Sequence, residues 1–235
     1  MFAGPNGSGK TTIKNGLNRP AAWFGIYLNP DDLEKSIEES GGVSIAKFDL
    51  DIETSELRDY FVDSTFLKSR KLEISPDSIR YSDGRIEFTN LVMNSYYVSV
   101  LADFLRRKAI EQSKSFSFET VMSAPDKVEL LHEAQQSGFR TYLYYVATDD
   151  PVINIERVKN RVARGGHDVP RDKIVARYYR SLALLPEAIR FSDRTFLFDS
   201  SGIESRYFAE VTDGRELETK SDEIPNWFRP VWEQF

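Results

Sequence analysis

At 235 residues the chain is long enough to bury a substantial core, and we expect one domain spanning residues 1–235. The absence of cysteine excludes disulfides and cysteine-based zinc or thiol sites, and two histidines are too few for a histidine-rich metal site. A net charge of −6 argues against broad nucleic-acid binding. With no membrane-length apolar run and no signal peptide, we expect a cytoplasmic protein without a membrane partner.

The first residues carry a phosphate-binding motif. The run Gly4-Pro5-Asn6-Gly7-Ser8-Gly9-Lys10-Thr11 matches the pattern G-x-x-x-x-G-K-[ST]. Its glycines let backbone N–H groups turn toward a polyphosphate, and the helix that follows adds the positive end of its dipole. We expect Lys10 to reach the β- and γ-phosphates and the Thr11 hydroxyl to hold Mg²⁺. The sequence therefore predicts an ATP site with Mg²⁺ as cofactor, formed by Gly4, Pro5, Asn6, Gly7, Ser8, Gly9, Lys10, Thr11 and Thr12.

The remainder alternates strand and helix patterns. A phosphate loop usually follows a buried strand of about five residues, but only three residues precede Gly4, so either the strand is a stub or the chain begins inside it. Further strands are expected at 23–28, 115–120, 140–147 and 195–198, separated by helices. This pattern predicts an α/β, three-layer P-loop NTPase fold with a mainly parallel five-stranded core sheet and helices on both faces.

Two segments stand apart from this alternation. Residues 41–90 do not read as a βα unit; a helix over 55–68 and a hairpin joined through Ser82-Asp83-Gly84 predict an α+β insertion. A second hairpin signal lies at Thr212-Asp213-Gly214. The aromatic residues near the C-terminus either pack over the edge of the sheet or form a partner surface; they are Trp227, Phe228, Trp232 and Phe235.

Residues 154–180 predict a basic helical lid. Between Glu156 and Arg180 the sequence holds eight Lys/Arg and three Asp/Glu, and Gly165-Gly166 separates two helical patterns. Arginines on a mobile lid neutralise the charge of a transferred phosphoryl group and exclude water, so Arg164 and Arg177 are candidate catalytic residues. The alternative for each arginine is an ordinary solvated helix face. His167 is expected to act as a hinge or capping residue.

Carboxylates follow two of the predicted parallel strands, where ligands bind in open α/β sheets. Asp31 and Asp32 follow the strand at 23–28, and Glu119 ends the strand at 115–120. One of the two aspartates is expected to cap the helix over 33–39. The other is available as a base that accepts a hydroxyl proton.

Several of these segments together resemble the zeta-toxin-like family of P-loop kinases, often labelled "predicted ABC-type ATPase". The resemblance rests on the phosphate loop, on Asn29-Pro30-Asp31, Phe118-Glu119-Thr120, Arg161 to Pro170, Arg177 to Leu182 and Asp199 to Gly202. It implies an ATP-dependent kinase that phosphorylates a hydroxyl of a small molecule, a nucleotide sugar such as UDP-N-acetylglucosamine. It also implies a separate antitoxin protein as partner. No Leu-Ser-Gly-Gly-Gln-type signature occurs, which argues against a transporter ATPase.

Carried over by position, the resemblance makes Asp31 the base and gives Glu119 and Thr120 contacts to the acceptor. Asp32 is a rival for the base or a substrate contact. Two other functions stay open: a 5′-hydroxyl nucleic-acid kinase, and a nucleotide-dependent binding switch without transfer. The kinase would need a basic groove for the nucleic acid, and only few basic residues, Lys68, Arg70 and Lys71, are available for it.

Overall fold

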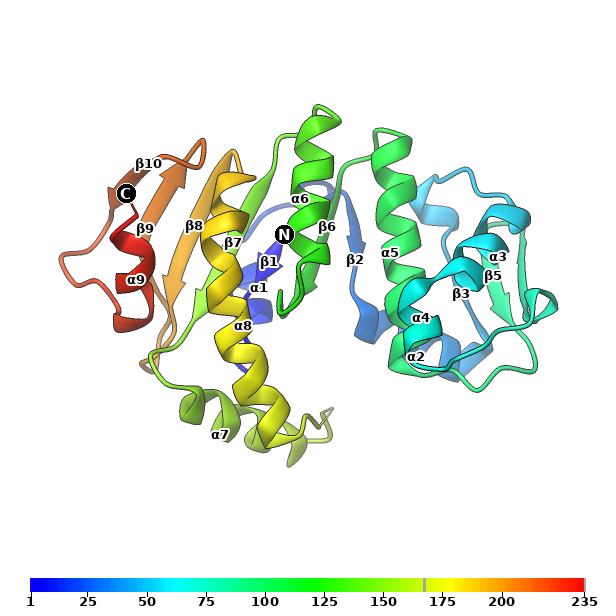
Figure 1. Cartoon of the computed structure of the whole chain (residues 1–235), viewed down its shortest axis with the longest axis horizontal. Coiled ribbons are helices and arrows are strands. Elements are labelled where there is room, and N and C mark those ends of the chain that lie inside the picture. The colour runs from blue at the N-terminus through cyan, green and yellow to red at the C-terminus, as the bar shows by residue number, and fades with distance from the viewer. Residues whose placement is uncertain (167, 235) are drawn as a thin grey trace. The chain divides into compact units, whose positions relative to one another are not determined.

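The computed structural model describes residues 1–166 and 168–234 (Figure 1). The chain forms two compact units: unit 1 comprises Met1–Arg19 and Glu119–Phe235, and unit 2 comprises Pro20–Phe118. Their boundary falls inside strand β6 (Phe116–Thr120), whose first three residues pair with β2 in unit 2 and whose last two pair with β1 in unit 1. No helix within the described residues combines the length and apolarity needed to span a bilayer.

Unit 1 is built on a mostly parallel sheet. Its strands are ordered β10-β9-β8-β7-β1-β6. Strands β1, β6, β7 and β8 run parallel, and β9 and β10 add an antiparallel hairpin. Its turn residues Asp213 and Gly214 both have positive φ, at 50° and 65°, as a tight hairpin turn requires. The bounds are β1 Phe2–Ala3, β7 Tyr142–Ala147, β8 Arg194–Asp199, β9 Arg206–Thr212 and β10 Glu216–Thr219.

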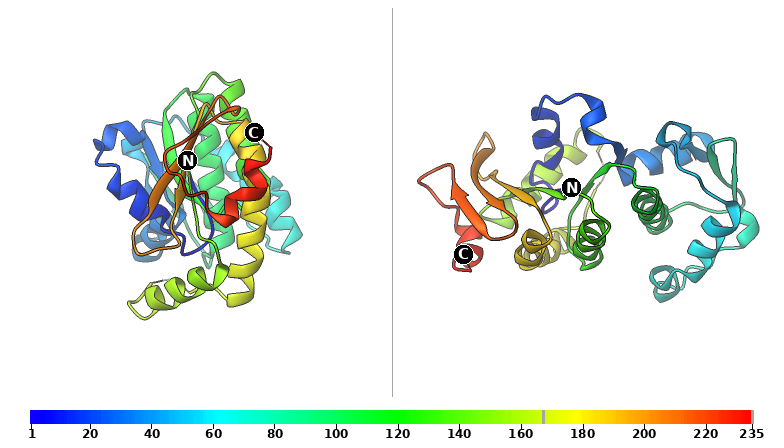
Figure 2. Two further views of the ribbon diagram at one scale, coloured as in Figure 1. Left: turned by 90° about the vertical axis from the view of Figure 1, so that its left-hand side faces the viewer. Right: turned by 90° about the horizontal axis from the view of Figure 1, so that it is seen from above.

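Helices cover both faces of this sheet. Figure 2 shows α6 and α8 on one face and the short α1 on the other. Along β7, residues 143–147 are buried, as expected of a central strand with neighbours on both sides. A row of stacked rings crosses the sheet, with Tyr144 centred 4.9 Å from Phe2 and 4.7 Å from Phe196. The helices are α1 Lys10–Gly16, α6 Asp126–Gln136, α7 Pro151–Val162, α8 Arg171–Arg190 and α9 Arg229–Trp232, with a 3₁₀ turn η4 at Asn226–Phe228.

Unit 2 combines helices with a second, small sheet. Strand β2 (Ile26–Leu28) pairs in parallel with the first residues of β6, and α5 packs on it. The hairpin predicted around Asp83 is present as β4 and β5, and β3 joins it to give the order β3-β5-β4. The bounds are η1 Ala21–Phe24, α2 Pro30–Ser40, β3 Gly42–Ser44, η2 Ala46–Phe48, α3 Thr54–Asp63, α4 Thr65–Ser69, η3 Pro76–Ser78, β4 Ile79–Ser82, β5 Arg85–Phe88 and α5 Ser95–Glu111.

Local capping explains where helices depart from the sequence pattern. The helix expected over 55–68 is divided at Ser64, which has an extended ψ of 107° and whose Oγ accepts a hydrogen bond from the Leu67 N–H over 3.3 Å. Apolar residues at 3–4 residue spacing over 90–112 predict one helix. Helix α5 begins only at Ser95, because the Asn94 side chain accepts hydrogen bonds from the N–H groups of Tyr96 and Tyr97. The longest helix is α8, with 20 residues.

The predicted α/β class with a five-stranded parallel core is confirmed, since β2, β6, β1, β7 and β8 each pair in parallel with their neighbours. The interpretation of 1–235 as a single domain with an insertion at 41–90 stays a prediction; unit 2 contains those residues but is wider. Near the C-terminus, Trp227 and Phe228 are buried, and Trp227 packs on Tyr145 and Phe208. These two aromatics therefore cover the sheet rather than form an exposed surface. Phe235 lies outside the described residues.

Candidate functional site

The phosphate loop follows β1 and is packed against the neighbouring strand and helix. A Cβ on Gly4, whose φ is +140°, would lie 2.0 Å from the Val146 carbonyl oxygen. A Cβ on Gly7, whose φ is +74°, would lie 2.7 Å from the Asn154 carbonyl oxygen and 3.3 Å from Val158 Cγ2. Both positions therefore require glycine for two reasons: the backbone has a positive φ, and a side chain would collide with neighbouring backbone atoms. The loop turns as the motif predicts, and α1 begins at Lys10.

The loop holds donors that the chain itself leaves unused. The N–H groups of five residues donate no hydrogen bond to the part of the chain that the structure describes: Asn6, Gly7, Gly9, Thr11 and Thr12. The buried Oγ of Ser8 and Oδ1 of Asn6 likewise have no partner there. Lys10 Nζ donates to the carbonyl oxygens of Gly4 (2.9 Å) and Pro5 (3.0 Å). Unpaired polar groups in a shielded loop are costly, and an anion in the loop would accept hydrogen bonds from the five N–H groups and from the Ser8 hydroxyl.

Asn154 of α7 braces the loop, a role that the sequence analysis did not assign. Its Nδ2 donates to the Asn6 carbonyl oxygen over 2.6 Å, and its Oδ1 accepts a hydrogen bond from the Thr148 hydroxyl. Asn154 and Thr148 are both fully buried. The Tyr178 hydroxyl donates to the Thr148 carbonyl oxygen over 2.6 Å, and burial raises the pKa of this tyrosine, so it stays a donor. One sequence feature could have indicated this role of Asn154. It is a polar residue one turn from Val158, on the apolar side of an amphipathic helix.

Glu119 lies beside the residue predicted to hold magnesium. The Thr11 hydroxyl donates to Glu119 Oε2 over 2.7 Å, and Lys14 Nζ is 4.0 Å from Oε1. Hydroxyl and carboxylate oxygens are ligands that Mg²⁺ accepts beside phosphate oxygens and water. The Thr120 hydroxyl accepts a hydrogen bond from the Met122 N–H over 3.0 Å and so shapes the turn after β6. No cluster of three or more His, Asp or Glu suited to a metal occurs in the described residues.

Asp31 and Asp32 lie in unit 2, in the first turn of α2. The prediction that one of them caps this helix is wrong, because α2 starts earlier, at Pro30, and its cap is Asn29. The Asn29 side chain accepts a hydrogen bond from the Asp31 N–H over 3.2 Å. Both aspartates are exposed, and neither carboxylate accepts a hydrogen bond from the described chain. Because neither aspartate caps the helix, both carboxylates, and not only one, are available as a candidate base.

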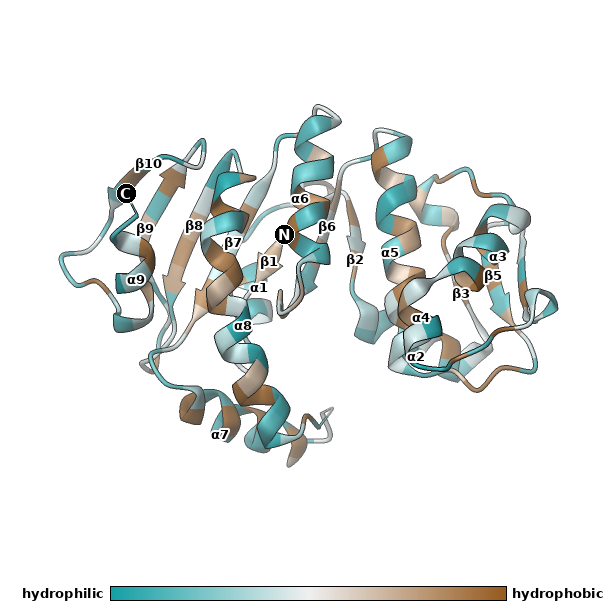
Figure 3. Cartoon of the chain, viewed as in Figure 1, coloured by the Kyte–Doolittle hydropathy of each residue, from teal (hydrophilic) through white to brown (hydrophobic). Residues whose placement is uncertain are grey.

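The predicted lid is a hairpin of α7 and α8 with its own small core. Val158, Val169 and Ile174 are buried together, and Ile155 and Val162 pack against them. Both helices alternate hydrophobic and hydrophilic segments (Figure 3). Arg164 lies exposed in the turn after α7 and Arg177 half-buried on α8, and neither side chain pairs with another described residue. His167 lies outside the described residues.

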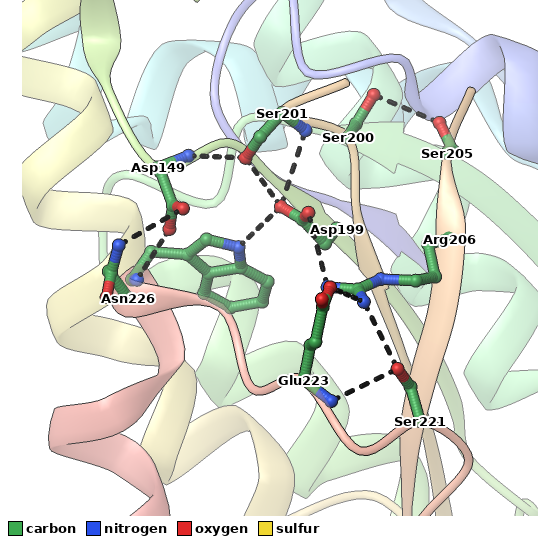
Figure 4. Close-up of polar contacts among 10 residues, drawn as sticks. Asp149, Asp199, Ser200, Ser201, Ser205, Arg206, Ser221, Glu223 and Asn226 are labelled. Atoms are coloured by element: carbon green, nitrogen blue, oxygen red, sulfur yellow. Dashed lines mark hydrogen bonds and ion pairs between the residues drawn. The ribbon is translucent and has the colours of Figure 1, made fainter. Parts of the chain in front are cut away.

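A polar network joins the ends of β7 and β8 to the C-terminal segment (Figure 4). Asp199 Oδ1 accepts hydrogen bonds from the Ser201 hydroxyl (2.6 Å) and from Trp227 Nε1 (3.2 Å). The Asp149 N–H donates to Ser201 Oγ over 2.9 Å, and Asp149 Oδ1 accepts from the Trp227 N–H over 3.0 Å. Asp199, one of the residues that carried the family resemblance, is therefore occupied in holding the chain together.

Comparison with known proteins gives a family and a fold. The sequence model described as "Zeta toxin" matches residues 89–212, more than half of the chain. Two crystal structures of AvrRxo1-ORF1:AvrRxo1-ORF2, one with sulphate ions and one with ATP, have TM-scores of 0.51 and 0.52 at 15% and 16% identity. Each match covers 99% of this chain and 62% of the other. An uncharacterized protein of Haemophilus influenzae is 33% identical over 70 residues, which are 30% of this chain and 50% of that protein.

Proposed function

The chain belongs to the zeta toxin family, and we propose that it is an ATP-dependent phosphotransferase that moves the γ-phosphate of ATP to a hydroxyl of a small molecule, a nucleotide sugar of the UDP-N-acetylglucosamine kind. The observation that carries the proposal is the phosphate loop, with five unpaired N–H groups and a lysine directed at the loop carbonyls. This arrangement suits a polyphosphate. A solved structure with the same fold is described as containing ATP.

Magnesium has a suitable place beside the loop. Thr11 and Glu119 would hold the ion, and when bound it would offset negative charge on the β- and γ-phosphates. Lys10 would release the carbonyl oxygens of Gly4 and Pro5 and turn to the phosphates. Since Glu119 engages Thr11, we favour a role at the metal over the acceptor contact that the family resemblance implied. Thr120 stays a candidate for the acceptor contact.

For the transfer step we assign Asp31 as the base that takes the proton of the acceptor hydroxyl. The assignment is supported by the exposed Asp31 carboxylate, which accepts no hydrogen bond from the described residues and lies three positions after the end of the parallel strand β2. Asp32 is the rival, because it has the same exposure one residue later. Arg164 and Arg177 would neutralise charge on the transferred phosphoryl group, since both lack a partner within the described residues.

A separate antitoxin protein is a further part of the proposal. The structural neighbours are complexes of an ORF1 with an ORF2 product. This chain spans 62% of the length of each matched chain. We therefore infer a partner protein and an acceptor from membership of the zeta toxin family, and not from the two matched structures.

The alternative of a 5′-hydroxyl nucleic-acid kinase is weakened by the aromatic residues that it would use for stacking. Phe88 and Tyr97 are buried in the core of unit 2. Tyr96 is partly exposed, but its ring lies 5.1 Å from the Arg70 guanidinium and 5.8 Å from the Phe66 ring. Few aromatic rings are therefore accessible for stacking against successive bases of a nucleic acid. The binding switch keeps only part of its proposed surface, because Trp227 and Phe228 are buried whereas Trp232 is exposed.

The deciding experiment is mass spectrometry of candidate acceptors after incubation with Mg²⁺ and ATP. The acceptors are UDP-N-acetylglucosamine, a panel of nucleotide sugars and 5′-hydroxyl oligonucleotides, each with a Lys10→Ala control. A Lys10-dependent gain of one phosphate on a sugar nucleotide supports the proposal. Phosphate on the oligonucleotide supports the alternative, and ATP binding without any transfer favours the switch.

A further inference from the structure

Strand β10 forms one edge of the sheet in unit 1. It stands last in the strand order, next to β9 (Figure 1). An edge strand uses one row of its backbone groups to pair with its neighbour and presents the other row outward, where another strand can pair with it. Natural edges are often protected by a bulge, a proline or a cover of charged side chains, so the residues of β10 decide whether this edge is closed or open to a partner.

The backbone groups of Leu217 and Thr219 face away from β9. The Lys220 N–H donates to the Phe208 carbonyl oxygen over 2.7 Å, which continues the register of β10 on β9. Since hydrogen-bonded residues alternate along an antiparallel strand, Glu218 also bonds to β9, and Leu217 and Thr219 do not. Within residues 1–166 and 168–234, no loop or side chain bonds to the backbone of Leu217 or Thr219. Two donors and two acceptors are therefore directed outward.

The charged side chains of β10 are arranged symmetrically about Glu218. Glu216 lies two positions before it and Lys220 two positions after it, so the three side chains point to the same face of the sheet. Glu216 is exposed, and its carboxylate has no partner in the described part of the chain. A second copy of this strand, running antiparallel, would place a lysine opposite Glu216 in both copies. The edge is therefore complementary in charge to itself.

One contact in this arrangement brings like charges together, because Glu218 would lie opposite Glu218 of the other copy. The sheet already contains such a pair, since Glu218 lies opposite Glu210 of β9. Each of these carboxylates has a basic partner: Lys220 Nζ is 2.5 Å from Glu218 Oε1, and Arg194 contacts Glu210. The same Lys220 contact offsets the charge of Glu218 in each copy.

We propose that β10 is an interaction surface for a second copy of this chain, which pairs with it about a two-fold axis at Glu218. Leu217 of each copy exchanges backbone hydrogen bonds with Thr219 of the other, and Glu216 of each copy lies opposite Lys220 of the other. The same patch is used on both copies, so the contact closes at two and leaves neither β10 edge open.

The contact is separate from the phosphate site. Strands β9, β8 and β7 lie between β10 and β1, which leads into the phosphate loop. The inference therefore does not rest on the proposed function, and the absence of phosphate transfer would not affect it.

The first measurement is sedimentation velocity of the full chain over a range of concentrations. A pair of four-residue strands is a small interface, so we expect a monomer–dimer equilibrium in the micromolar range. A chain that stays monomeric up to about 1 mM would overturn the proposal and leave the edge to a strand of a different protein.

Exchanging the charges tests the register. Glu216→Lys and Lys220→Glu should each weaken the dimer about tenfold, because two attractive cross-strand pairs become repulsive. The double variant Glu216→Lys/Lys220→Glu restores opposite charges and should return the dissociation constant to within about threefold of the original. Both side chains belong to exposed residues, so the fold tolerates the exchange. A double variant as weak as the single variants would overturn the pairing.

Thr219→Pro tests the backbone contact. Proline is tolerated on an edge strand where the N–H faces away from the sheet, and here it removes the outward donor of each copy. We expect the dissociation constant to rise about tenfold or more, because two hydrogen bonds are lost. Thr219→Val keeps the N–H and is the matched control. Melting temperatures of both variants check that they are folded, and equal dimerisation of the two folded variants would contradict strand pairing.

Discussion

Thr11 and Glu119 are 108 positions apart in the chain, yet the hydroxyl of one donates to the carboxylate of the other over 2.7 Å. The Glu119 side chain is only 12% exposed, which places a largely shielded negative charge at the residue expected to hold magnesium. The family resemblance implied an acceptor contact for this glutamate. Its geometry favours a role in holding the metal, and the two roles lead to different kinetic results.

We expect Glu119→Gln to raise the Mg²⁺ concentration needed for half-maximal transfer by about tenfold or more, because the amide keeps the size but removes the charge. Activity titrated with Mg²⁺ at saturating ATP and acceptor checks this. Thr120→Val, which also alters the end of β6, is the control for the acceptor. An unchanged Mg²⁺ requirement with a raised acceptor KM would return Glu119 to the acceptor side.

Asp31→Asn should abolish transfer and leave ATP affinity within about twofold, because a base acts on the acceptor hydroxyl and not on the nucleotide. A general base contributes roughly 10²–10⁴-fold. Asp32→Asn is the matched control, since both residues are exposed in the first turn of α2. The measurement is single-turnover transfer beside ATP binding. Retained activity in Asp31→Asn with loss in Asp32→Asn would shift the assignment by one residue.

Arg177→Ala should lower kcat far more than ATP affinity, by about 10²-fold or more, if its guanidinium acts on charge that develops during transfer. Arg180→Ala is the control one turn along α8; Arg180 Nε already donates to the Ala176 carbonyl oxygen over 3.3 Å. Steady-state kinetics and ATP titration together check the prediction. Parallel losses in kcat and ATP affinity would make Arg177 a binding residue only.

The sequence was sufficient for those features that depend on local chemistry. The phosphate loop, the five parallel strands and both hairpins follow from glycine positions, apolar runs and turn residues, and all are present. Helix starts were less accessible to prediction, because the periodic patterns extend past the caps at Ser64 and Asn94, whereas the pattern over 33–39 begins after the true start of α2 at Pro30. Contacts between distant segments could not be read from spacing at all.

Asn154 and Arg157 are examples of such contacts. Each lies on a helix whose amphipathic pattern is complete without it, so neither residue is needed to explain α7. Their partners, Asn6, Ser200 and Gly202, are more than forty positions away. Only the packing of α7 against the phosphate loop and the β8–β9 loop gives these side chains a role.

Asn154→Ala should weaken ATP binding even though Asn154 is positioned to touch the loop rather than the ligand. The substitution leaves the Asn6 carbonyl oxygen without the Asn154 donor, at about 1–3 kcal/mol for one unsatisfied group, whereas the Thr148 hydroxyl keeps the Asp150 carbonyl oxygen as an acceptor. We expect lower thermal stability that ATP partly restores, measured by thermal unfolding with and without nucleotide. An Asn160→Ala variant, at an exposed position of the same helix, should behave as the unmodified chain. Equal melting temperatures for Asn154→Ala and the unmodified chain would show that the loop needs no brace.

The last prediction concerns acid stability and Glu210 of β9. Burial alone would raise the pKa of this carboxyl, but hydrogen bonds from the Tyr207 hydroxyl (2.6 Å) and from Arg194 bring the pKa below its ordinary value of 4.5. A lowered folded-state pKa contributes stability that is present above pH 4.5 and is lost as the pH falls through the folded-state pKa. Glu210→Gln should therefore lower the free energy of unfolding at pH 7 by about 1–3 kcal/mol, typical of hydrogen bonds to a charged group. The deficit should shrink as the pH falls below 4.5. Urea unfolding at pH 7, 5 and 4 measures the difference, and a deficit that is constant with pH would mean that the carboxylate charge of Glu210 contributes nothing to folding.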